Sequence, residues 1–103
     1  MKITIQSPGF KADQKLLTFV TKKLEKLDLF YDSIIEGQVS LKTDKPEIVE
    51  NKMCEIKLVV PGNDLFAARN SKNFENAVTK TVSALKSQLL DLKKTHKGLV
   101  APN

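Results

Sequence analysis

Apolar side chains in this chain follow two different spacings, one of two residues and one of three to four. Near the start, Ile3 and Ile5 alternate with polar residues, which predicts a short first strand that ends at residues 7–9, Ser-Pro-Gly. From Asp13 onward the spacing is three and four, so we predict a helix over about residues 12–28. Its apolar face consists of Leu16, Leu17, Val20, Leu24 and Leu27.

The middle of the chain predicts three strands. Residues 34–43 alternate, and residues 44–47 have the composition of a turn. Residues 53–60 alternate again, with a buried face formed by Cys54, Ile56, Leu58 and Val60. A Pro-Gly-Asn-Asp turn then predicts a hairpin to a fourth strand over residues 65–69.

A second helix is predicted after a cap at Ser71 or Asn73, running to about Thr95 with a stop at Gly98. One face of this helix carries Phe74, Val78, Thr81, Leu85, Leu89 and Leu92. The order β-α-β-β-β-α predicts an α+β fold in two layers, because a four-stranded sheet with both helices on one face buries both apolar stripes. We expect one domain over residues 1–97 and a flexible tail over residues 98–103.

The net charge of the chain indicates the class of partner that it binds. The 103 residues include 17 basic and 12 acidic side chains, for a net charge of +5. This balance favours an anionic partner such as nucleic acid or an acidic membrane surface. Every basic residue except Arg69 is a lysine, which contacts phosphate as a point charge and reads bases poorly.

Helical-wheel positions gather the lysines into stripes away from the apolar faces. The stripe of the first helix holds Lys11, Lys15, Lys22 and Lys26, with Lys23 at its side. That of the second holds Lys86, Lys93 and Lys97, with Lys94 and Lys80 further round. If both helices lie on one side of the sheet, the molecule has a basic helical face and a more acidic opposite face. A merely solvated lysine-rich surface is the alternative explanation.

The sequence shows no catalytic constellation, so we expect no enzyme, cofactor, metal or small-molecule substrate. His96 is the only histidine and is expected to be solvated, while Cys54 lies on the apolar face of a strand. We expect Phe19, Phe30 and Phe74 in the core and leave Tyr31 and Phe66 open. No apolar run is long enough to cross a membrane, and the expected compartment is the cytoplasm.

Two stretches resemble a known family. One is residues 17–35, with Phe19-Val20, the lysines that follow, and Tyr31-Asp32. The other runs from Asn73 to Lys97 and contains Ala77-Val78, Leu85 and Gln88-Leu89. Together with the order of elements, they resemble the short ribosome hibernation promoting factors and ribosome-associated inhibitors of the sigma-54 modulation, or S30EA ribosomal protein, family. The chain departs from the family pattern at Ala84 and Ser87, where basic residues are usual; Lys80 and Lys86 partly compensate.

The resemblance implies a fold laid out like a double-stranded RNA-binding domain and a translation inhibitor that acts in ribosome hibernation. Such a protein binds the small ribosomal subunit in the mRNA and tRNA channel and blocks both ligands, contacting 16S rRNA through its basic helices. Because the chain ends at Asn103, we expect a short form that lacks the C-terminal ribosome-pairing domain. The expected rRNA-binding residues are Lys15, Lys22, Lys23, Lys26, Lys86, Lys93, Lys94 and Lys97, with Lys11, Lys80 and Arg69 secondary. Lys45 and Lys52 are expected to matter less.

Two alternatives stay open. A free double-stranded RNA binder would be satisfied by a naked duplex, whereas the ribosome-bound inhibitor needs the assembled subunit. A protein-interaction module, such as a modulator of sigma-54, would bind through an apolar patch and resist high salt.

Overall fold

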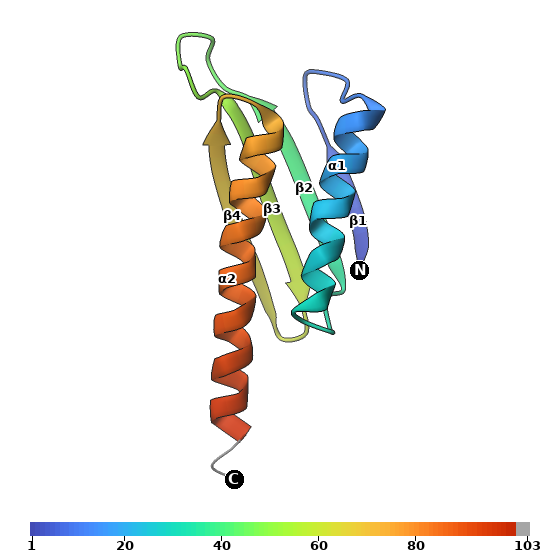
Figure 1. The fold of residues 1–103 in the computed structure, drawn as a ribbon, viewed down its shortest axis with the longest axis vertical. Coiled ribbons are helices and arrows are strands. Elements are labelled where there is room, and N and C mark those ends of the chain that lie inside the picture. Colours follow the sequence, from blue (N-terminus) through green and yellow to red (C-terminus); the bar gives the residue numbers. More distant parts are fainter. Residues whose placement is uncertain (101–103) are drawn as a thin grey trace.

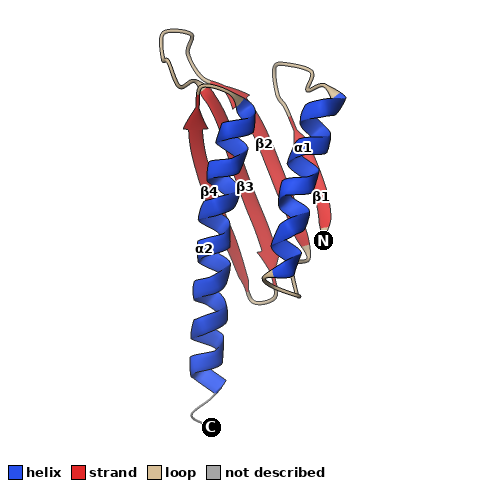
Figure 2. Ribbon diagram, viewed as in Figure 1, coloured by secondary structure: helices blue, strands red, loops and turns tan. Residues whose placement is uncertain are grey.

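The computed structural model describes the backbone of residues 1–100 and the side chains of residues 1–94. Its elements follow the predicted order, β-α-β-β-β-α, with a short 3₁₀ turn, η1, after the first helix (Figures 1 and 2). Their bounds are β1 Lys2–Gln6, α1 Gln14–Glu25, η1 Lys26–Leu29, β2 Glu36–Thr43, β3 Lys52–Val60, β4 Asn63–Ser71 and α2 Phe74–Val100.

The four strands form one mixed sheet in the order β1-β2-β3-β4. β1 runs parallel to β2, with Lys2 opposite Glu36, and the other two pairs are antiparallel. The parallel pair needs a crossover, and α1 provides it. Both helices cover the same face of the sheet (Figure 2), which confirms the predicted two-layer α+β fold and leaves the other face open.

The hydrophobic core lies between the two layers. The predicted apolar faces supply it, and Val20 and Leu24 of α1 and Leu85 and Leu89 of α2 have no exposed surface. The sheet contributes Val39, Leu41, Cys54, Ile56, Leu58, Val60, Leu65 and Ala67. Burial of these side chains is the main force that holds each helix on the sheet.

Both helices begin at residues whose side chains cap the first turn. Asp13 is the cap of α1, and one of its carboxylate oxygens accepts a hydrogen bond of 2.8 Å from the backbone N–H of Leu16. At α2 the side-chain oxygen of Asn73 accepts a hydrogen bond of 2.7 Å from the N–H of Asn76. Asn73 is therefore the cap of α2, and Ser71 is the buried last residue of β4.

Several predicted boundaries were wrong by a few residues. The α-helical part of the first helix ends at Glu25, and β2 begins at Glu36 instead of residue 34. β4 starts earlier, at Asn63, because Gly62 has a φ of +77° and turns the chain within two residues. α2 continues past Thr95 and Gly98 to Val100 and projects beyond the sheet (Figure 1). A helical glycine costs only about 1 kcal/mol relative to alanine, so Gly98 alone does not end it.

Candidate nucleic-acid interface

The outer surface of α1 carries the first lysine stripe. Because Val20 and Leu24 fix the inner side of the helix, the positions near half a turn away face solvent. The exposed lysines of this stripe are Lys11, which precedes the helix, Lys15, Lys22 and Lys26. Lys23 is half-buried beside them, and its ammonium lies 5.5 Å from the centroid of the Phe19 ring.

The second stripe lies on α2, which runs beside α1 on the sheet (Figure 1). Lys86 and Lys93 are exposed on it. The ammonium of Lys86 lies 4.4 Å from the centroid of Phe30, which directly follows η1. This cation–π contact shows that Lys86 is on the side of α2 that faces the end of the first helix, so the two stripes belong to one continuous surface. We call this surface the helical face.

Two predicted site residues lie elsewhere. Lys80 forms an ion pair of 3.8 Å with Glu50 of the β2–β3 loop. Arg69 is on the edge strand β4, where its guanidinium donates a hydrogen bond of 2.7 Å to the carbonyl of Ala68. Both line a hollow together with Ser83, Ala84 and Ser87. The structure therefore separates these two residues from the helical face and places them along the β4 edge.

Two further predicted site residues belong to the later part of α2. Lys94 is exposed and lines a shallow hollow with Lys93, Leu90 and Asp91. The side chain of Lys97 lies outside the described residues, as do that of His96 and the tail beyond Val100.

Two lysines that were not predicted to bind, Lys52 and Lys72, lie beside the first stripe. They line a hollow of about 490 Å³ with Lys11 and Lys15, at the end of the molecule where both helices begin. Lys52 was predicted to matter less, and its position beside Lys11 makes it an unsuitable control. No local signal could have found this pair, because their proximity comes from the β3–β4 register, in which Lys52 lies opposite Ser71.

The open face of the sheet is polar and electrically balanced. Its charged side chains are Lys2, Lys42 and Lys57 against Glu36, Glu55 and Asp64. Four of these form two ion pairs, Lys42–Glu55 at 2.9 Å and Lys57–Asp64 at 3.4 Å. The face opposite the helices is thus neutral and not acidic, because the excess carboxylates of residues 28–71 lie at the two ends of the sheet.

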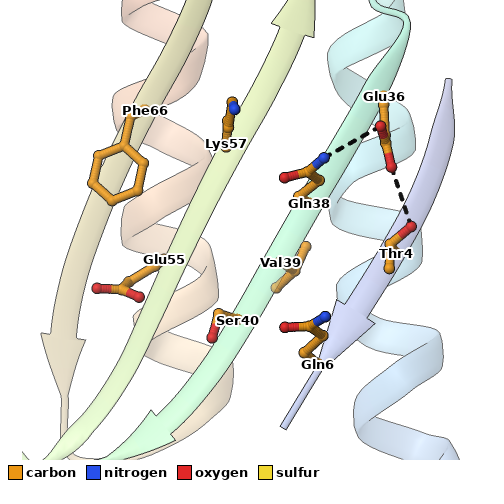
Figure 3. A pocket seen from close by; sticks show the side chains of 9 residues that line it. All are labelled: Thr4, Gln6, Glu36, Gln38, Val39, Ser40, Glu55, Lys57 and Phe66. Carbon is orange, nitrogen blue, oxygen red and sulfur yellow. Dashed lines mark hydrogen bonds between the residues drawn. The ribbon is translucent and has the colours of Figure 1, made fainter. Parts of the chain in front are cut away.

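A shallow hollow of about 420 Å³ crosses this open face (Figure 3). Thr4 and Gln38 both reach toward Glu36, whose carboxylate accepts a hydrogen bond of 3.3 Å from each of them. At the β4 side Phe66 is 58% exposed. Phe66 is therefore a surface residue, while Phe19, Tyr31 and Phe74 pack against the core from its edge.

The remaining candidate chemistry is structural. Cys54 is fully buried, which confirms its prediction as a core residue. Burial raises the pKa of its thiol to about 11, and this outweighs the lowering by a hydrogen bond with Thr81. Within the described residues no three His, Cys, Asp or Glu side chains are grouped to hold a metal ion. None of the described helices has the length and apolar character needed to span a membrane.

Comparison with known proteins relates this fold to one family. Residues 3–97 match the family model described as Sigma 54 modulation protein / S30EA ribosomal protein. No curated protein matches the sequence significantly.

Two solved structures share the fold at low sequence identity. The N-terminal domain of protein Y from Thermus thermophilus superposes with a TM-score of 0.77 at 20% identity, and the match covers 89% of this chain and 99% of that one. A ribosomal subunit interface protein from Coxiella burnetii gives a TM-score of 0.82 at 21% identity, covering 91% and 99% respectively.

Proposed function

This chain belongs to the Sigma 54 modulation protein / S30EA ribosomal protein family, and from that premise we propose that it inhibits translation by binding the small ribosomal subunit. In this proposal the helical face docks on 16S rRNA in the channel for mRNA and tRNA, and the body of the domain blocks both ligands. The two structural relatives share the fold, and one of them is named as a ribosomal subunit interface protein.

The main support for the proposal is that the lysines of the helical face are not paired with carboxylates among the described side chains. Among the described side chains, no lysine of the helical face forms an ion pair with a carboxylate, whereas two of the three lysines on the open sheet face do. Ammonium groups without counter-charges are free to replace the cations around RNA phosphates, and release of those cations drives binding. Such contacts carry no base information, so the shape of the docking site must provide the selectivity.

Inhibition by steric exclusion requires no catalysed reaction. A folded domain with a tightly packed core loses little conformational entropy when it docks. It can exclude mRNA and tRNA by occupying their space. We therefore expect one copy of the protein to silence one subunit, with an occupancy set only by affinity and concentration.

Two matched triple variants test the proposal. Lys15, Lys22 and Lys26 are changed to Gln on the helical face, and Lys2, Lys42 and Lys57 are changed to Gln on the open sheet face. Both triples remove the same charge. Co-sedimentation with small subunits should weaken at least about tenfold for the helical triple at physiological salt, because three phosphate contacts are lost, and change little for the sheet triple.

Equal weakening by both triples would show that only net charge matters and would contradict the assignment to the helical face. A filter-binding assay of tRNA on the same subunits reports the block itself, and the wild-type protein should displace tRNA stoichiometrically. Excess naked RNA duplex distinguishes a free duplex binder, since it would then remove the protein from the subunits.

A further inference from the structure

Positive charge extends from the first stripe into the hollow where α1 and α2 begin. Four lysines line it: Lys11, Lys15, Lys52 and Lys72. They come from three separate parts of the chain, namely the entry to α1, the first residue of β3 and the junction between β4 and α2. We call this site the four-lysine corner.

An aromatic contact holds the corner together. The rings of Phe10 and Phe74 stack with their centroids 4.9 Å apart and their planes 12° apart. This contact ties the loop before α1 to the first turn of α2. The ammonium of Lys52 lies 5.8 Å from the centroid of Phe74, which attaches β3 to the same point. The lysines therefore converge on a fixed place on the surface.

The charge of the corner is poorly compensated within the protein. Two carboxylates also line it, those of Asp13 and Glu75, which leaves a local excess of two positive charges. The carboxylate of Asp13 is engaged as the cap of α1, 2.8 Å from the N–H of Leu16. Within the described part of the chain, none of the four lysines forms an ion pair. An external anion would relieve the repulsion that the two carboxylates leave uncompensated.

The corner joins the start of the first stripe, Lys11 and Lys15, to two lysines from other elements, so its geometry differs from that of a stripe along one helix. Lysines along a helix recur about every 5.4 Å per turn and can follow one line of phosphates. In the corner, lysines from three directions meet at one hollow, which matches a point where phosphates from different directions crowd together. Crowded phosphates hold more condensed cations and gain more from replacement by fixed ammonium groups.

We infer that the four-lysine corner binds the phosphates of two RNA segments that meet at a bend or junction, while the stripes follow a single groove. The inference rests on the proposed function and specifies its RNA target. The corner then sets where the domain stops along the RNA, because a straight helix offers no such crowding.

A pair of double variants tests the contact. Lys52 and Lys72 are changed to Gln in one, and Lys42 and Lys57 of the open sheet face are changed to Gln in the matched control. For small-subunit binding, the negative slope of log K against log salt should become shallower by about 1.4–1.8 for the corner variant and stay unchanged for the control. Thermal unfolding of both variants checks that these surface changes leave the fold intact.

A tethered probe tests the junction. A hydroxyl-radical source is attached at Glu75→Cys, which lines the corner, or at Gln38→Cys on the open sheet face as the control. The native Cys54 is buried and stays unlabelled. Cleavage from position 75 should fall in two rRNA segments that are distant in the rRNA sequence, and cleavage from position 38 should be weak or absent.

Three results would overturn the inference, and they are distinguishable. If the corner variant has an unchanged salt slope while the wild type binds normally, the corner does not contact the RNA. Cleavage confined to one continuous rRNA helix would show that the corner contacts RNA but not a junction of two segments. Failure of the wild-type protein to bind small subunits removes the proposed function and the inference with it.

Discussion

At the scale of the single residue, Gly37 of β2 lies where α1 packs tightly on the sheet. A Cβ atom at this position would lie 2.8 Å from Cδ2 of Leu24, which is fully buried, and 3.1 Å from the sulfur of Met1. Gly37→Ala should therefore lower the free energy of unfolding by about 1–3 kcal/mol, because the packed core must shift to admit the methyl group. Urea denaturation measures the change.

The matched control is Ser40→Ala, on the same strand but facing the open side of the sheet. It should change the free energy of unfolding by no more than about 0.5 kcal/mol. If Gly37→Ala is as stable as the wild type, Leu24 must have space to move that the structure does not show.

Cys54 makes the free energy of unfolding depend on pH in the alkaline range. Its thiol has a pKa raised by burial to about 11, while the unfolded chain has the ordinary value of 9.0. Between these pH values the thiol of the unfolded chain loses its proton while that of the folded chain keeps it. The contribution of Cys54 to the free energy of unfolding is therefore fully present below pH 9 and is lost as the pH rises toward 11. Relative to Cys54→Ala, the wild type should lose on the order of 2 kcal/mol between pH 8.5 and 11.

Guanidinium denaturation of both proteins across that pH range measures this difference. Comparison with the variant cancels every other effect of pH, because both proteins share it. Parallel curves for the two proteins would mean that the thiol does not change its protonation on unfolding, and would contradict the burial of Cys54.

At the scale of the element, the start of α1 depends on one cap. Asp13→Ala should lower the free energy of unfolding by about 1 kcal/mol, because the N–H of Leu16 loses its 2.8 Å partner, whereas Asp13→Asn keeps the cap and the stability. Asp13→Asn also removes a negative charge from the four-lysine corner. It should bind small subunits more tightly than the wild type at low salt.

Thermal unfolding and co-sedimentation separate the two effects. Asp13→Ala removes the same charge as Asp13→Asn, so both variants should gain affinity while only one loses stability. A loss of affinity in both would indicate that the carboxylate of Asp13 has a direct role at the RNA.

At the scale of the whole molecule, the two faces have different electrostatic characters. The helical face has lysines without ion pairs among the described residues, and the open sheet face balances three lysines with three carboxylates. Small-subunit binding through the helical face should therefore weaken steeply with salt. With about 5–8 phosphates engaged, the slope of log K against log salt should lie between about −4 and −7.

A sucrose-cushion assay over a salt series measures this slope. Binding that persists unchanged at high salt would contradict docking on RNA and would favour a protein-interaction module. A steep slope that naked duplex RNA fully competes away would favour a free duplex binder instead.

Features that depend on local periodicity could be predicted from the sequence. The spacing of Ile3 and Ile5, of Val20 and Leu24, and of Leu85 and Leu89 predicted the elements and their inner faces. Net charge and helical spacing likewise predicted a basic helical surface. These features were predictable because each depends on residues a few positions apart. The lengths of the elements were less accurate, since capping, a tight glycine turn and the weak stop at Gly98 decide them.

Which lysines share a surface depends on the packing of distant segments and could not be predicted from the sequence. The register that places Lys52 opposite Ser71 brings Lys52 and Lys72 to Lys11, and no spacing along the chain encodes that meeting. Packing also places Lys80 beside Glu50 and away from the helical face. The pairing of the strands makes the open sheet face neutral. Periodicity is a property of one segment, whereas an interface depends on how distant segments pair.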